Sequence, residues 1–479
     1  MIDKLVQIPI TVTSRPFMSA ADKCDFTRRG YREDEYFIYG KANVYASSPD
    51  GGIVVETPDV PYVDRFMVRY PADATAASGN VIVEILNATT AMDIDRMWIL
   101  CKDHHMRHGD VYVAITSKSL TTFALKKFDS ARYAPISWKD PVEHSFPMTM
   151  TGNCGGGDTI EGMEDGLFWD MLTDLADALR SGVVDLGGIE VSRVYLTGWS
   201  QSGGYMLTYI NRLLPMYEVG REKPVFDGYL AGGAAYTCAP GLNQRETPAG
   251  DSPEELRIRA CSAPVIFVHT ESENARIGGR AAQQPDSDTP TLRYRRYEIP
   301  GSTHDAKYNM FDYYWGSDDQ QRVGVILKNP GMTDTPNDYP YEIVFHAAWQ
   351  FLDDWVQKGV APPSVARIEV CEDGLTNHTD EHGNAVGGYR LPPIDLPVCT
   401  WHPISIPIRA DFAFDCTLYG YKTYFAVETL KRMYTSLAHY RDLVERQTRT
   451  LVDAGLVLAE DAEELVRRTV QLAVEAGMQ

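Results

Sequence analysis

The segment VYLTGWSQSGGY at residues 194–205 constrains this chain more than any other. Its opening residues are β-branched, apolar or aromatic, which is typical of a buried strand, and SGGYMLTYINRLL (202–214) then has the pattern of a helix. The turn between them is rich in small residues, and Ser200 lies at its apex. Such a strand–turn–helix segment holds a serine on a strained turn with its hydroxyl exposed. The segment therefore predicts a nucleophilic serine, although an inert turn has a similar pattern.

A turn of this kind needs small residues on both sides of the serine, because the backbone passes close to itself. Gly198 and Ser202 lie two residues before and two residues after Ser200. The usual pattern has a glycine at the position of Ser202, but a serine is also small enough for the turn. In the alternative register Ser202 is the nucleophile, flanked by Ser200 and Gly204. We favour Ser200, because that register ends the strand next to the turn glycine.

A nucleophilic serine needs a histidine as base and an acid that orients the histidine. Where a strand–turn–helix segment carries the serine, the acid and then the histidine follow it along the chain. PVIFVHTESEN (264–274) places Glu271 and Glu273 directly after a predicted strand. YEIPGSTHDAKY (297–308) places His304 in a loop after the next strand. We favour Glu273 over Glu271 as the acid, because at Glu273 the loop has turned away from the strand end.

Two backbone N–H groups are expected to stabilise the negative oxygen that forms when the serine attacks. One belongs to Gln201, because the first N–H groups of a helix point toward its N-terminal end. The second should come from the loop after the predicted strand VIVEIL (81–86), from Asn87 or Ala88. We assign the pair to Gln201 and Ala88.

Strands and helices alternate through the middle of the chain. The predicted strands include 81–86, 111–116, 194–198 and 264–270, and the predicted amphipathic helices include 164–182 and 341–359. This order is typical of an α/β protein with a mostly parallel, twisted sheet and helices on both faces. Together with the order of serine, acid and histidine, it predicts the α/β-hydrolase fold.

The character of the sequence changes twice along the chain. We predict a β-rich N-terminal segment at 1–60, a catalytic core at 61–360 and a C-terminal extension at 361–479. The extension is first irregular and rich in glycine and proline, and then regains helical periodicity. Our hypothesis for the extension is a cap over the pocket, because its glycine-rich part looks too compact for a linker.

The net charge of −21 argues against partners that carry negative charge. Nucleic acid and anionic membranes would be repelled by such a surface. No apolar run reaches the length of about 18 residues that a membrane-spanning helix needs. The N-terminal residues lack the pattern of a secretory signal, so we expect a cytoplasmic protein.

Cysteines and histidines give no strong metal-binding motif. The eight cysteines are scattered without a C-x-x-C pair, which argues against a structural zinc site, and a single bridge such as Cys238 to Cys261 stays open. The histidines cluster near the end of a predicted helix, at His104, His105 and His108, together with Asp103 and Asp110. We expect a solvated helix end there rather than a metal site. No cofactor is expected.

Several segments together resemble a bacterial family of uncharacterised α/β-hydrolase-domain proteins with an S-Q-S motif at the nucleophile. They are VIVEILNATTAMD, GDVYVAITSKS, GWSQSGGYMLTYIN, FDGYLAGG, TESEN, EIPGSTHD and GNAVGGYRLPPIDLPV, in the family's order across residues 75–478. The resemblance implies Ser200 as nucleophile, His304 as base and an acid in TESEN. Glu273 stands where that family often has Asp, and Trp199 is a second departure. The resemblance implies no particular substrate.

We therefore expect a serine hydrolase that cleaves a small-molecule carboxylic ester through an acyl-enzyme on Ser200. An amidase, a lactonase or an acyltransferase could use the same residues. A non-catalytic binding protein of the same fold stays open, and so does a metal-dependent hydrolase that uses residues 103–110. The chain could also form a homo-oligomer.

Overall fold

The computed structural model describes residues 1–142, 162–246, 256–276, 280, 282–314, 316–324, 336–373, 376–407 and 415–479. The chain forms two compact units. The first comprises Met1–Val265, Ala281–Tyr294 and Gly316–Leu327, and the second comprises Ile266–Arg280, Arg295–Trp315 and Lys328–Gln479. The boundaries predicted at residues 60 and 360 stay a prediction.

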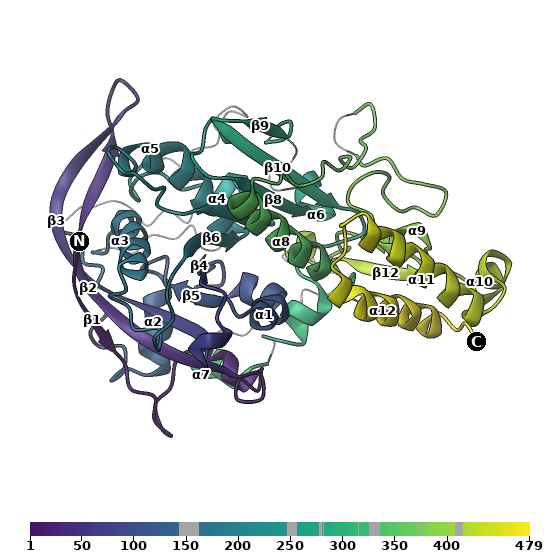
Figure 1. Ribbon diagram of the computed structural model, residues 1–479, viewed down its shortest axis with the longest axis horizontal. Helices are drawn as coiled ribbons and strands as arrows, with labels where there is room; N and C mark the ends of the chain where they lie inside the picture. The colour runs from purple at the N-terminus through teal and green to yellow at the C-terminus, as the bar shows by residue number, and fades with distance from the viewer. Residues whose placement is uncertain are drawn as a thin grey trace. The chain divides into compact units, whose positions relative to one another are not determined.

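The first unit is built on seven neighbouring strands. In spatial order they are β1 (Ile2–Gln7), β2 (Tyr31–Ser47), β3 (Ile53–Pro71), β5 (Val111–Ile115), β4 (Asn80–Ile85), β6 (Arg193–Trp199) and β7 (Gly228–Gly232). The pairs β5–β4, β4–β6 and β6–β7 are parallel, whereas β1, β2, β3 and β5 pair antiparallel in turn. The predicted α/β fold with a mostly parallel sheet is confirmed. The predicted β-rich N-terminal segment forms the long antiparallel ribbon at the left of Figure 1.

The central strands form because most of their residues are apolar and both faces of the sheet are covered. Every residue of β4 and β5 is buried, as expected for parallel strands covered by helices on each side. On one face, Glu84 of β4 accepts hydrogen bonds of 2.9 Å from the Met97 and Trp98 N–H groups, at the start of α1 (Arg96–His108). On the other face, Tyr36 stacks on Phe66 and its hydroxyl donates to the carbonyl of Asp185.

The remaining helices of the first unit complete its layers. They are α2 (Thr121–Phe128), α3 (Phe168–Arg180), α4 (Gln201–Thr208), a π-helical turn (Tyr209–Leu213), α5 (Leu214–Tyr217) and α7 (Asp318–Val323). The predicted helix at 202–214 is therefore α4 and the π-helical turn, and α5 continues beyond it. A short strand, β9 (Ser287–Thr289), pairs antiparallel with the first residues of β10 (Leu292–Ile299).

Two arginines of β3 form ion pairs inside the first unit. The side chains of Arg65 and Arg69 are both 0% exposed, and each contacts one acid on β2 and one acid in the loop after β4. The contacts are Arg65 Nη1 to Glu35 Oε1 at 3.3 Å, Arg65 Nη2 to Asp93 Oδ2 at 2.9 Å, Arg69 Nε to Glu33 Oε2 at 2.8 Å and Arg69 Nη1 to Asp95 Oδ2 at 2.5 Å. Buried charges are tolerated only when they are paired in this way.

The second unit holds two neighbouring strands and most of the C-terminal half. Its elements are β8 (Val265–Thr270, from its second residue), α6 (Glu271–Arg276), the last residues of β10, a π-helical turn (Lys307–Phe311), α8 (Glu342–Lys358), α9 (Pro392–Asp395), the hairpin of β11 (Cys399–His402) and β12 (Tyr421–Tyr424), α10 (Val427–Tyr434), α11 (Leu437–Asp453) and α12 (Ala462–Glu475). The helix predicted at 341–359 is confirmed as α8, which ends at Gly359 with φ 66°.

Between residues 424 and 478 the C-terminal extension contains three helices, α10, α11 and α12. The segment at 454–461 separates α11 from α12. A buried pair ties this region to α8, because His346 Nδ1 lies 2.8 Å from Asp461 Oδ2. The role of the extension as a cap stays a hypothesis.

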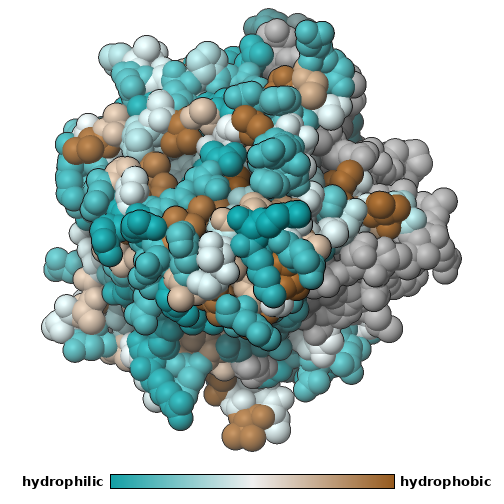
Figure 2. Space-filling view, turned by 90° about the vertical axis from the view of Figure 1, so that its right-hand side faces the viewer, coloured by the Kyte–Doolittle hydropathy of each residue, from teal (hydrophilic) through white to brown (hydrophobic). Residues whose placement is uncertain are grey.

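The surface on the right-hand side of Figure 1 is shown in Figure 2. Its coloured residues are mainly hydrophilic, and hydrophobic side chains are interspersed among them. In the part of the chain that the structure describes, no helix has the length and apolar character needed to cross a membrane.

The suggested bridge between Cys238 and Cys261 does not form. Cys261 is a buried free thiol just before β8. Cys238 is disulfide-bonded, so its sulfur is not available to Cys261.

The fold makes stability depend on the protonation of Glu84. Burial, and then the nearby charge of Asp95, raises the pKa of this carboxyl from 4.5 to about 8. The folded state therefore binds the proton more tightly than the unfolded state. The resulting stabilisation is complete below about pH 4.5 and is lost as the pH rises to about 8.

We expect Glu84→Gln to remove this dependence, because its amide does not ionise. The free energy of unfolding of the wild type, relative to the variant, should fall by several kcal/mol over this range, at about 1.4 kcal/mol per pH unit. Urea unfolding at intervals of pH measures it, with Glu428→Gln on the exposed side of α10 as control. Parallel profiles for wild type and Glu84→Gln would contradict the assignment.

Candidate active site

Ser200 occupies the turn between β6 and α4 in a strained conformation. Its φ is 56° and its ψ is −118°, in a region that residues other than glycine rarely adopt. Three hydrogen bonds of 3.0 Å hold the backbone in place. The Ser200 N–H donates to the carbonyl of Gly232, and the Ser200 carbonyl accepts from the N–H groups of Gly204 and Ala235. The start of α4 and the end of β7 thus fix the turn.

The glycines around Ser200 are explained by close backbone contacts. A Cβ atom on Gly198 would lie 2.8 Å from the carbonyl oxygen of Ser202, and one on Gly203 would lie 2.9 Å from the Cα of Ala234. Any larger side chain would push the turn apart, which agrees with the requirement for small residues read from the sequence.

The two candidate serines have different environments. Ser202 is fully buried, and its hydroxyl accepts from the Trp199 N–H at 2.9 Å and donates to the Trp199 carbonyl at 3.0 Å. Ser200 is partly exposed. The hydroxyl of Ser202 therefore closes the turn, and these surroundings favour Ser200 as the nucleophile.

The loop after β4 is joined to the turn by two residues. Asn87 Nδ2 donates to the Trp199 carbonyl at 2.8 Å, while the N–H of Asn87 donates to the carbonyl of Ile94 at 3.0 Å. The N–H of Ala88 donates to Oε1 of Gln201 at 3.2 Å. Of the two backbone donors considered in this loop, Ala88 is thus the one directed at the residue after Ser200. Sequence reasoning missed the anchoring role of the Asn87 side chain.

The second unit brings His304 and Glu273 together. His304 Nδ1 lies 2.6 Å from Glu273 Oε1, and both side chains are buried, at 4% and 1% exposure. Thr270 donates to both carboxylate oxygens of Glu273, through its hydroxyl at 2.7 Å and through its backbone N–H. The N–H of His304 donates to Ser272 Oγ at 2.9 Å. These bonds hold the acid and the imidazole in one orientation, and the part played by Ser272 was not anticipated.

Glu271 contacts other groups. Its Oε2 accepts from the Gly301 N–H at 2.7 Å and its Oε1 accepts from Asn377 Nδ2 at 3.0 Å. Burial raises the pKa of this carboxyl above its usual value. Glu271 therefore joins the loop that precedes His304 to the C-terminal extension, whereas Glu273 contacts His304 itself.

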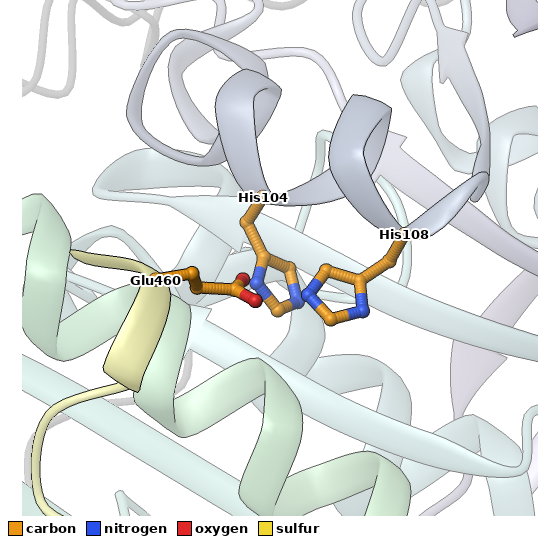
Figure 3. A group of neighbouring side chains, drawn as sticks. All are labelled: His104, His108 and Glu460. Atoms are coloured by element: carbon orange, nitrogen blue, oxygen red, sulfur yellow. The ribbon is translucent and has the colours of Figure 1, made fainter. Parts of the chain in front are cut away.

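The histidine cluster differs from the expected solvated helix end, because His104 and His105 are buried at 4% and 1% exposure. Figure 3 shows His104 and His108 projecting from consecutive turns of α1, with ring centroids 4.3 Å apart. His105 Nδ1 lies 2.9 Å from Asp110 Oδ2. Within the first unit, ligand atoms of His104, His105 and Asp110 lie within 4.8 Å of one another, so these three side chains could hold a metal ion.

The chain is similar to a known protein family and to several solved structures. A family model described as "Alpha/beta hydrolase domain" matches residues 6–467. No curated protein matches the sequence. Similar solved structures include the siderophore hydrolase EstA from Aspergillus nidulans, at 13% identity over 57% of this chain and 88% of that chain, with a TM-score of 0.28. Brefeldin A esterase, a bacterial homologue of human hormone sensitive lipase, has 14% identity over 62% and 76%, with a TM-score of 0.27. These partial likenesses indicate nothing about the activity of this chain.

The close approach at Gly198 predicts a large effect of one methyl group. We expect Gly198→Ala to lower the free energy of unfolding by about 1–3 kcal/mol, because the new Cβ would overlap the Ser202 carbonyl. Thermal unfolding measures the change. Gly52→Ala is the matched control, since its Cβ would meet first the movable hydroxyl of Ser48 at 3.1 Å in an exposed turn. Equal stability of the two variants would argue against the described turn.

Proposed function

Because this chain belongs to the alpha/beta hydrolase domain family, we propose that it is a serine hydrolase that cleaves a carboxylic ester. The observation that carries the proposal is the strained Ser200, with φ 56°, at the start of α4. A backbone of this kind is costly, and such strain is concentrated at sites of chemistry. No cofactor is needed for the proposed reaction.

The proposed reaction has two halves. Ser200 Oγ attacks the ester carbonyl carbon, and His304 Nε2 takes the hydroxyl proton. The tetrahedral intermediate collapses, the alcohol leaves with the proton from His304, and the acyl group stays on Ser200. In the second half a water molecule gives a proton to His304 and attacks the acyl carbon. The carboxylic acid then leaves and Ser200 regains its proton.

Glu273 is proposed to orient the base. With a proton on Nδ1, His304 donates to Glu273 Oε1 across 2.6 Å, which leaves the lone pair of Nε2 for the serine. A glutamate is longer than the aspartate often found at this position of the resembled family. The contact with His304 supports the view that glutamate can fill the same role.

The N–H groups of Gln201 and Ala88 are proposed to bind the negative oxygen of the intermediate. The Ala88 N–H is bonded to Gln201 Oε1 at 3.2 Å, which is long for such a bond. A negatively charged oxygen is a stronger acceptor than an amide carbonyl. In this proposal the substrate oxygen displaces the Gln201 side chain as the intermediate forms.

Fluorophosphonate labelling tests the nucleophile. We expect the probe to modify Ser200 in the wild type and in Ser202→Ala, and not in Ser200→Ala, as read by peptide mass mapping. Ser202→Ala should unfold at a lower temperature, because both hydrogen bonds to Trp199 are lost. Modification of Ser202 would shift the register by two residues. Folded wild type that is not labelled would contradict the proposal and favour a binding protein of this fold.

Kinetics on p-nitrophenyl esters test the acid. We expect Glu273→Gln to lower kcat by roughly 10²–10⁴-fold with little change in KM, because the imidazole loses its orienting partner. Glu271→Gln is the matched control, two residues away and also buried, and should alter stability more than kcat. Equal losses of kcat in both variants would contradict the assignment.

Replacing the esters by anilides tests for an amidase, and added chelator tests for a metal-dependent hydrolase.

A further inference from the structure

We propose that the first unit carries a second ligand site, for a small carboxylate with an apolar tail. The site is a cavity of about 700 Å³ between the tip of the β2–β3 hairpin and the far end of the helix that begins after Ser200. Ligand pockets usually measure about 300–1,000 Å³. The eight residues of α4 span about 12 Å, so the cavity is separate from the turn that holds Ser200.

One wall of the cavity is apolar. The buried Leu207 of α4 and Ala239 line it together with the half-buried Ile53 and Met216. Side chains of this type offer a surface for an alkyl chain, whose removal from water favours binding.

The rim of the cavity carries two arginines. Arg212 Nη2 donates to Ser47 Oγ at 2.7 Å, and its Nη1 lies 3.7 Å from Glu246 Oε2, so its charge is partly balanced. Arg259 is exposed, and no ion pair joins it to an acid in the part of the chain that the structure describes. On a chain with net charge −21, this is a local site where an anion is favoured.

The side chain of Asn211 holds the backbone at Arg259 in place. Asn211 lies in the π-helical turn, and its Oδ1 accepts from the Arg259 N–H at 3.3 Å while its Nδ2 donates to the Arg257 carbonyl at 2.9 Å. The loop that carries Arg259 is thereby held against the turn that carries Arg212. Asn211 and Arg212 of the π-helical turn both line the cavity, and such turns are frequent at functional sites.

These features together define the ligand class. A guanidinium binds a carboxylate with two parallel hydrogen bonds, and the apolar wall receives the chain attached to it. The anionic group of such a ligand would bind the arginines at the rim, and its apolar tail would lie against the apolar wall. The proposal rests on the cavity and its lining residues and does not depend on Ser200, although ester hydrolysis releases acids of this class.

Calorimetric titration with decanoate tests the site on the full chain. We expect one molecule to bind, with the same dissociation constant for wild type and Ser200→Ala. Arg259→Gln should weaken binding about tenfold or more, because it removes the charged partner of the carboxylate. Arg257→Gln is the matched control, since Arg257 is exposed, two residues away and outside the lining of the cavity.

Two further measurements distinguish the contribution of the ligand's carboxylate from that of its alkyl chain. Decanol should bind about tenfold more weakly than decanoate, and Met216→Glu should abolish binding by placing a negative charge on the apolar wall. Absence of binding to folded wild type would overturn the proposal, and so would equal affinities of Arg259→Gln and Arg257→Gln. Loss of decanoate binding after fluorophosphonate labelling would place the ligand at Ser200 instead. Because Ser200→Ala should still bind, failure of this site and failure of the proposed hydrolase are distinguishable.

Discussion

The buried ion pairs of Arg65 and Arg69 are the constraint on which the first unit depends. Each guanidinium joins an acid of β2 to an acid in the loop after β4, and neither arginine is exposed. Loss of one partner would leave an uncompensated charge in the interior, which costs about 3–5 kcal/mol. The antiparallel ribbon at the N-terminus therefore extends the sheet and also fixes the path of the loop that contains Ala88.

That loop is tied at its other end to the turn at Ser200. Asn87 donates to the carbonyl of Trp199, and Ala88 donates to the side chain of Gln201. Ion pairs at Asp93 and Asp95 and hydrogen bonds at Asn87 and Ala88 thus hold the same short segment from both sides. A donor that is placed before the substrate arrives needs little reorganisation during the reaction, which is the main source of electrostatic catalysis.

The sequence predicted those features that depend on neighbours along the chain. The turn at Ser200 follows from small residues within a few positions, and the helix α8 follows from its apolar periodicity and closing glycine. Glu271 and Glu273 could not be separated with certainty, because both follow β8, and their roles depend on partners such as Asn377, over a hundred residues away. The burial of His105 was missed for the same reason, because its surroundings also include residues far away in the chain. The hydroxyl of Tyr31, for example, donates to the His105 carbonyl.

The bond between Glu271 and Asn377 has a consequence for how such a chain can evolve. The same carboxylate binds the loop preceding His304 and a residue of the C-terminal extension, and Glu298 of β10 accepts from the N–H of Ile368 in that extension. The extension thus shares hydrogen-bonding partners with the scaffold of the histidine. A lineage could not shed it or exchange it for another module in one step, because Glu271 Oε1 would lose Asn377 and Glu298 Oε2 would lose the Ile368 N–H, inside a buried part of the unit. The extension and the histidine loop are therefore expected to be inherited as one block.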